Sequence, residues 1–179
     1  MSLEQYAGTY TLDAAHSRIG FVARHAMITK VRGNFNDFAG TATLAPVVSD
    51  SSVSVEIQVQ SVDTRQQQRD DHLRSPDFFD VATYPTITFA STAVSATSEG
   101  IDITGDLTIK DVTRSVTIPF SFEGAAVDPF GNHRIGFEGS VQVNRQDFGL
   151  VWNAALEAGG VLVGDKVTLE FEISAIKSA

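Results

Sequence analysis

The stretch "VTLEFEISAIK" (residues 167–177) alternates apolar and polar side chains with a period of two. Val167, Leu169, Phe171 and Ile173 fall on one face of an extended chain, and the residues between them, two glutamates included, fall on the other. Such alternation is typical of a β-strand with one buried face and one face in water. The stretch therefore predicts a sheet that must bury one of its faces.

The same alternation recurs along most of the chain. In "SVSVEIQVQSVD" (52–63), valine and isoleucine face away from serine, glutamate and glutamine. Turn-forming stretches separate the segments, and no interval holds a helical pattern of roughly 10–15 residues, which excludes a βαβ arrangement. About eight strands are therefore predicted, the others at 17–25, 31–44, 86–96, 101–110, 115–124 and 133–143.

A sheet with one continuous apolar face must close on itself or pack against a second sheet. Long consecutive strands joined by short turns favour an extended antiparallel, eight-stranded, up-and-down barrel, with a Greek-key sandwich as the alternative. Residues 1–179 are expected to form this one all-β domain. Glycines inside the strands fit the bends and bulges of a barrel, namely Gly20, Gly33, Gly105, Gly136 and Gly139.

One or two short helices are predicted beside the barrel. In "SPDFFDVA" (75–82), Ser75 is placed to cap a helix whose first residue is Pro76. In "WNAALEAGG" (152–160), a helix would start at Trp152 and end at the glycine pair.

The charged run "RDDHLR" (69–74) stands shortly before two adjacent phenylalanines. Asp70 and Asp71 are neighbours in sequence, and neighbouring carboxylates seldom converge on one substrate, so both are expected to be solvated. We interpret the run as a polar connection, and Phe78 with Phe79 as an aromatic plug at the open end of the barrel.

The sequence holds no pattern that specifies an enzyme. Walker-type loops, GxGxxG, HExxH, GxSxG and EF-hand patterns are missing, and no metal site is predicted. His25 shares strand parity with Phe21 and is expected to face the interior, where a neutral imidazole could hydrogen-bond the head of a ligand. An enzyme that uses His25 or His72 as acid or base inside the barrel stays open as an alternative.

The composition narrows the partners and the compartment. A formal net charge of −9 and a pI near 4.7 disfavour nucleic acid and polybasic docking to anionic membranes. The absence of cysteine excludes thiolate catalysis and disulfides. No stretch reaches the roughly 18 apolar residues of a membrane span, and "MSLEQYAGTYTLD" (1–13) lacks the features of a secretory signal. We therefore expect a cytoplasmic protein with no membrane span.

Phenylalanine dominates the aromatic residues, with 12 Phe against 3 Tyr and 1 Trp. The interior of an eight-stranded barrel is either just filled by side chains or hollow enough for one small ligand. A hollow lined by Phe, Val, Ile and Leu selects an apolar guest, and ~15 buried carbons are worth roughly 12 kcal/mol before the entropic cost of binding. The predicted ligand-binding residues are Phe21, His25, Phe35, Phe38, Val55, Ile57, Phe78, Phe79, Phe89, Leu107, Phe120, Phe137, Arg145, Trp152, Leu169 and Phe171.

Several stretches together resemble the YceI-like family of lipocalin-like, polyisoprenoid-binding proteins. The similarity extends from about Thr9 to Ile176. Where the family often has Gly and Pro, this chain has Asp111 and Ser115, which leaves the conformation of that turn open. The stretches are "LDAAHSRIGFVARH", "VRGNFNDFAGTATL", "SVEIQVQSVDTRQQQRDDHLRSPDFFDVATYPTITF", "GDLTIKDVTRSVTIPF" and "NRQDFGLVW".

The resemblance implies an extended lipocalin-like barrel whose hydrophobic pore holds a long isoprenoid lipid, such as a prenylated quinone or a polyprenyl phosphate. It also implies a frequent homodimer, and it places Phe78 and Phe79 on a helical segment beside the pore. No cofactor is expected besides this bound lipid.

Two questions about this function stay open in the sequence. A diphosphate head would need an arginine partner, for which Arg145 and Arg24 are the candidates. Because the surface is acidic, we hypothesise that a neutral quinone head is preferred. A filled barrel that acts only as a stress-related scaffold is the second alternative to a non-enzymatic lipid carrier.

Overall fold

The segments with alternating residues form the strands. Within residues 3–178, which the computed structural model describes, each predicted strand segment contains a strand, and only β1 was not predicted. The prediction of one continuous strand at 31–44 and at 52–63 is wrong, because residues 36–37 interrupt the first and a 3-10 turn at Val59–Ser61 interrupts the second. The strands are β1 (Gly8–Leu12), β2 (Arg18–His25), β3 (Thr29–Phe35), β4 (Phe38–Leu44), β5 (Ser52–Gln58), β6 (Val62–Asp63), β7 (Thr86–Ala96), β8 (Gly100–Ile109), β9 (Val112–Val127), β10 (His133–Asn144) and β11 (Val163–Lys177). The helices are α1 (Gln67–Arg74) and the short 3-10 turns η1 (Glu4–Tyr6), η2 (Ala14–His16), η3 (Val48–Asp50), η4 (Val59–Ser61) and η5 (Arg145–Phe148).

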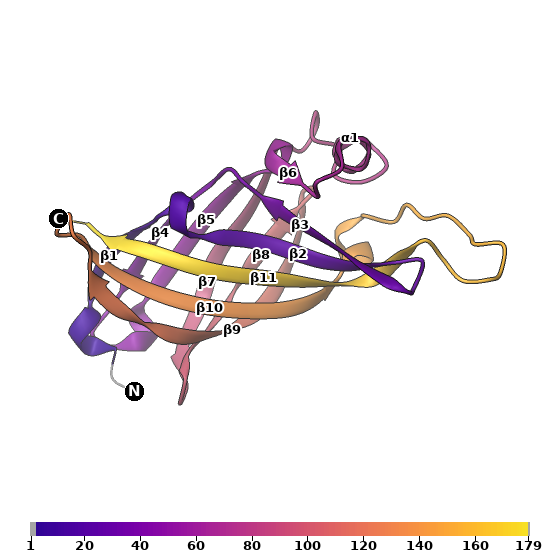
Figure 1. Cartoon of the computed structure of the whole chain (residues 1–179). Coiled ribbons are helices and arrows are strands. Elements are labelled where there is room, and N and C mark those ends of the chain that lie inside the picture. Colours follow the sequence, from indigo (N-terminus) through magenta and orange to yellow (C-terminus); the bar gives the residue numbers. More distant parts are fainter. Residues whose placement is uncertain (1–2, 179) are drawn as a thin grey trace.

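These segments form a closed eight-stranded barrel, because several short strands continue one another (Figure 1). β1 and β2 run in succession along β11, with Tyr10 opposite Lys177 and Phe21 opposite Leu169. β3 and β4 run in the same way along β2 and β1. β4 pairs with β5, β5 pairs with β7, and from β7 each strand pairs antiparallel with the next until β11 returns to β1 and β2, whereas β6 pairs with β3. The up-and-down barrel is confirmed, and the sandwich alternative is wrong.

The barrel wall contains a stretch without strand pairing between β9 and β10. β9 and β10 are paired from Val127 opposite His133 as far as Phe120 opposite Gly139. Beyond that point the first half of β9 pairs with β8 alone, and the last residues of β10 pair with β11 alone. Pairing stops where β9 reaches Pro119, which has no N–H to donate. We call the unpaired stretch between residues 112–119 and 140–144 the seam.

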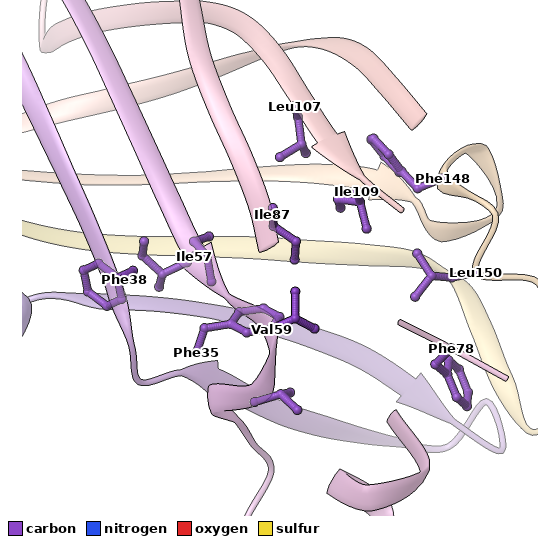
Figure 2. Packing of buried hydrophobic residues seen from close by; sticks show 12 residues of the cluster. Phe35, Phe38, Ile57, Val59, Phe78, Ile87, Leu107, Ile109, Phe148 and Leu150 are labelled. Carbon is purple, nitrogen blue, oxygen red and sulfur yellow. The ribbon is translucent and has the colours of Figure 1, made fainter. Parts of the chain in front are cut away.

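The apolar face of the strands points into the barrel. On β11, Leu169 and Phe171 line the interior, whereas Glu170 lies outside and pairs with Arg18 at 3.0 Å. The buried side chains form two clusters, one at each end of the barrel. Figure 2 shows the cluster at the α1 end, in which Phe78, Phe148 and Leu150 from the connecting segments join aliphatic side chains of the strands.

The helix prediction at residues 75–82 is wrong, and the helix lies one segment earlier. α1 covers the run that was predicted to be a polar connection, and its first turn is capped by the side chain of Gln66. The hydroxyl of Ser75 donates to the carbonyl oxygen of His72, so this serine ends a helix instead of beginning one. Asp70 is 7% exposed and accepts hydrogen bonds from the N–H and hydroxyl of Thr64, which corrects its expected solvation.

The predicted helix at residues 152–160 is a loop. The side chain of Asn153 hydrogen-bonds both the N–H and the carbonyl of Val163, which joins the two arms of the loop and competes with helical pairing. Ala155 bridges to Val161, and the glycine pair has positive φ in the turn between them. The glycines therefore close a turn, and they do not end a helix.

Two of the five strand glycines lie at an irregularity of pairing between the described strands. The register of β9 against β10 shifts next to Gly136, and that of β7 against β8 shifts next to Gly105, the partner of Ser91, as a bulge requires. Gly33, Gly105 and Gly139 lie under the rings of phenylalanines on neighbouring strands, and Gly20 lies under the side chains of Arg18 and Asn34. The predicted bulges are therefore found at two glycines, and at Gly20, Gly33 and Gly139 the missing side chain makes room for neighbours instead.

Candidate functional site

An apolar cavity of about 250 Å³ runs inside the barrel. Its lining comes almost wholly from carbon atoms and reaches both buried clusters. Tyr10 and Leu44 lie at the end near the two termini, whereas Phe78 and Phe148 lie at the other end, beside α1. We call this second end the mouth. The volume is near the lower limit of small-ligand sites in proteins.

Most residues that were predicted to bind a ligand line this cavity. The structure places these side chains around one cavity. Their contact with a ligand stays a prediction. The residues in the lining are Phe21, Phe35, Val55, Ile57, Phe78, Phe79, Phe89, Leu107, Phe120, Phe137, Arg145, Leu169 and Phe171.

Three predicted site residues lie elsewhere. His25 is exposed at the end of β2, opposite Thr29, because the strand has left the barrel by that point. Phe38 is buried in the core at the start of β4 but does not line the cavity. Trp152 packs outside the cavity, on the far side of Phe78. The predicted interior position of His25 is therefore wrong.

Phenylalanine rings and glycines form matched pairs in the cavity wall. Phe21 lies opposite Gly33 on β3, and Phe120 lies opposite Gly139 on β10. A Cβ on Gly139 would lie 2.6 Å from Cδ1 of Phe120, well inside van der Waals contact. The rings therefore lie against the wall, and the glycines leave the centre of the barrel open.

An aromatic group from two segments lies at the mouth. Phe78, which follows α1, has its ring 5.4 Å from that of Trp152 and 5.1 Å from that of His72. Phe79 packs edge-on against Phe35 of β3 at 5.8 Å. Both phenylalanines line the cavity, as the predicted plug requires, although they lie in turns and not on a helix.

Arg145 is a buried cation beside the mouth, but its guanidinium is fully engaged. Burial lowers the pKa of Arg145, although an arginine stays protonated in a protein. A guanidinium has five N–H donors, and each finds a protein acceptor here. The acceptors are the carbonyl oxygens of Leu150, Trp152, Val163 and Gly164 and the carboxylate of Asp165. Arg145 therefore fixes the loop before β11 and has no donor left for a diphosphate.

Several lining residues were missed by the sequence prediction. Ile101 and Ile103 face inward on β8, and the alternation of that strand was a sufficient signal for both. Tyr10 was missed because β1 itself was not recognised. Its hydroxyl donates to the carbonyl oxygen of Tyr6 at 2.6 Å, and burial raises its pKa. Phe148 lies in the turn after β10, where no strand pattern applies.

The lining has the chemistry of a hydrophobic binding site. A cavity with this lining offers an entering molecule dispersion contacts and the release of water from apolar surface. Within residues 3–178, no three His, Asp or Glu side chains gather where they could hold a metal ion. The helices of the described chain are all too short or too polar to cross a membrane.

A closed antiparallel barrel around an apolar cavity defines the lipocalin-like class of β-barrels. Within this class the chain belongs to the YceI-like domain family, whose sequence profile matches residues 10–175. A UPF0312 protein of Pseudomonas aeruginosa is 43% identical over 147 residues, which cover 80% of this chain and 77% of the relative. A UPF0312 protein of Shewanella denitrificans is 41% identical over 148 residues, covering 80% and 78%.

Solved structures share the fold. Burkholderia cenocepacia BcnA superposes with a TM-score of 0.78 at 26% identity, over 91% of this chain and 98% of that one. The Campylobacter jejuni YCEI protein has a TM-score of 0.74 at 28% identity, over 87% and 90%. A polyisoprenoid-binding domain from Saccharophagus degradans has a TM-score of 0.71 at 16% identity, over 94% and 98%, which shows likeness of fold alone.

Proposed function

We propose that the barrel binds a long-chain isoprenoid lipid and carries or stores it without changing it chemically. The observation that carries this proposal is the elongated cavity whose lining is almost wholly carbon. A prenyl chain is a flexible hydrocarbon, so it gains free energy from burial along its whole length, at about 0.8 kcal/mol for each CH₂. The likeness of fold to a domain described as polyisoprenoid-binding supports the same class of guest.

The charges around the cavity favour a neutral head group, such as a quinone, over a diphosphate. All donors of Arg145 are used by the protein, so this arginine is not free to bind phosphate. Arg24 is exposed and lies on the outer face of β2. A buried diphosphate would therefore lack the paired donors that offset its desolvation.

The positions of the histidines support binding over catalysis. An acid or base must come within hydrogen-bonding reach of the atom it serves. His25 is exposed at the tip of β2, and neither His25 nor His72 lines the cavity. His72 is instead held by Asp77 at 2.9 Å and packs edge-on against Trp152.

The test is to extract the purified, undenatured protein with organic solvent, identify the extract by mass spectrometry, and weigh the intact protein by native mass spectrometry. We expect one isoprenoid lipid for each chain. The native mass also measures the homodimer that the family resemblance implies. If a clean apoprotein takes up neither added prenylated quinones nor polyprenyl phosphates, the carrier proposal fails and a ligandless scaffold is favoured.

A further inference from the structure

The β2–β3 hairpin is the basic part of an acidic protein. Residues 14–36 contain Arg18, Arg24, Lys30 and Arg32 and no Asp or Glu, although the chain as a whole has a net charge of −9. Arg18 is paired with Glu170. The side chains of the other three make no hydrogen bond or ion pair with any part of the chain that the structure describes.

These three cations share the outer face of the hairpin. Arg24 lies directly opposite Lys30, and Arg32 lies opposite Val22, two residues along on the same face. Phe21 and Ala23, which alternate with them, line the cavity. Alternation along a strand therefore directs Arg24, Lys30 and Arg32 to the outside, where all three are exposed.

Exposed apolar side chains lie at the tip of the same hairpin and on the loop beside it. Met27 is 57% exposed and Ile28 is 78% exposed in the turn between β2 and β3. The loop at residues 149–162 adds Val151, which is 63% exposed, and Val161. The N–H of Ala26 donates to the carbonyl oxygen of Leu162 at 2.7 Å, so hairpin and loop are joined.

This surface lies beside the mouth of the cavity. Ala23 of the hairpin and Val163, directly after the loop, both line the cavity. Figure 1 shows the hairpin and the loop projecting at one end of the barrel, with the C-terminus at the other. Glu157 is the one acidic side chain of residues 149–162, so the projecting segments carry more positive than negative charge.

We propose that the hairpin tip and the adjoining loop dock the mouth of the barrel onto an anionic lipid bilayer. Isolated apolar side chains at a projecting tip insert into the interfacial region, while flanking Lys and Arg are attracted to anionic headgroups. The proposal rests on the proposed function, because a prenyl lipid has to enter the barrel from a membrane. The net negative charge disfavours docking for the chain as a whole, but at physiological salt it is screened beyond about 8 Å. The hairpin from Arg18 to Phe35 contains no acidic residue.

Vesicle flotation tests the docking. Wild-type protein should float with vesicles of phosphatidylcholine mixed with phosphatidylglycerol, and much less with phosphatidylcholine alone. Met27→Ser with Ile28→Ser should weaken the association about tenfold, and Lys30→Gln should weaken it about fivefold. The controls lie at the opposite end: Phe130→Ser removes a side chain that is 89% exposed, and Lys177→Gln removes an exposed charge that donates one hydrogen bond, to the carbonyl oxygen of Ala7. Both controls should float like the wild type.

A wild-type protein that stays with the bottom fraction overturns the docking surface and points to an acidic protein as the partner. Equal losses in the tip variants and in their controls overturn it as well. Uptake of a prenylated quinone added from ethanol, without vesicles, is measured in parallel on each variant. Uptake without flotation refutes docking and leaves the lipid-binding function standing, whereas flotation without uptake refutes lipid binding and leaves docking standing.

Discussion

The ring of Phe120 lies against Gly139, its direct partner across the β9–β10 pair, so closely that no methyl group fits between them. Phe21 packs on Gly33 in the same way across the β2–β3 pair, which lies on the other side of β11 from β9 and β10. An aromatic ring packed on glycine covers backbone that would otherwise be bare. The width of the cavity therefore depends on small residues that do not themselves line it.

Gly139→Ala should destabilise the protein and displace the Phe120 ring toward the cavity. A Cβ at this position would overlap both the ring and the carbonyl oxygen of Pro119, and such overpacking costs about 1–3 kcal/mol. Gly136→Ala on the same strand is the control, because the nearest atom to its added Cβ is 3.6 Å away. Urea unfolding measures both, and equal losses would contradict the account.

Leu107→Trp should narrow the cavity and weaken the binding of a prenylated quinone about tenfold, because the larger side chain competes for the same space. Leu107 is buried and lines the cavity. Asp106→Trp introduces the same side chain on the exposed face of the same strand, so it should bind like the wild type. The measurement is a titration followed by intrinsic fluorescence or native mass. Equal affinity in the two variants would argue that the guest lies elsewhere.

Phe78→Ala should open the mouth. Phe78 is buried against Trp152 and His72, and truncation of a buried phenylalanine costs about 3 kcal/mol of the free energy of unfolding. The exchange of a bound guest should also become faster, because the side chain closes one end of the cavity. Phe130→Ala, at an exposed position, should change stability by less than about 0.5 kcal/mol. Unchanged exchange in Phe78→Ala would show that the guest leaves by another route.

Arg145→Met should destabilise the protein by about 3 kcal/mol, because several buried carbonyl oxygens lose their donors. Arg145→Lys keeps the charge but cannot reproduce the fork of five donors, so it should rescue only part of the loss. Arg114→Gln is the control, since this exposed arginine donates one long hydrogen bond, 3.3 Å, to Asp147. If Arg145→Lys were as stable as the wild type, charge alone would explain the role of Arg145.

Arg134→Gln should lower stability at neutral pH and make less difference in acid. Arg134 joins Asp13 at 2.6 Å and Asp128 at 2.8 Å, and its hydrogen bond is the main cause of the lowered pKa of Asp13. Hydrogen bonds from Asn132 and Arg134 hold the pKa of Asp128 well below its usual range. A lowered pKa in the folded state stabilises the fold above the ordinary value of about 3.9, and this stability is lost as the pH falls through the lowered pKa.

Urea unfolding at neutral pH and at successive acidic pH values checks this prediction. The difference between wild type and Arg134→Gln should shrink below about pH 4, as the two carboxylates become protonated. Lys166→Gln, at an exposed position at the other end of β11, should show no such convergence. A difference that stays constant into acid would mean that the ion pairs contribute little.

The barrel was predictable because burial of one face imposes a period of two on every long strand. The same rule explains which side chains line the cavity, since strand parity alone directs Phe89 and Leu107 inward. His25 is an exception to this rule. Strand parity tells whether a side chain points into the barrel only as long as the strand is part of the barrel wall, and at His25 the β2–β3 hairpin extends past the mouth.

The two wrong helix predictions, at 75–82 and 152–160, have separate causes. Ser75 has the same preference for a hydroxyl–backbone hydrogen bond at either end of a helix, so its sequence position alone did not tell a start from an end. The loop at 152–160 depends on Asn153, which hydrogen-bonds Val163, and on Arg145, which donates to the carbonyl oxygen of Trp152. Because Val163 and Arg145 lie outside the segment, these contacts override the short helical pattern and the segment by itself does not reveal them.

The seam is a place where no backbone hydrogen bonds fix the circumference of the barrel. A continuous ladder of hydrogen bonds holds a closed sheet at a set circumference, because widening it means breaking backbone pairs. Across residues 112–119 and 140–144 there is no ladder to break, and Pro119 prevents one from extending there. We therefore expect a guest bulkier than the empty cavity to part β9 from β10 here before any other pair of strands, since no backbone hydrogen bond between them has to break.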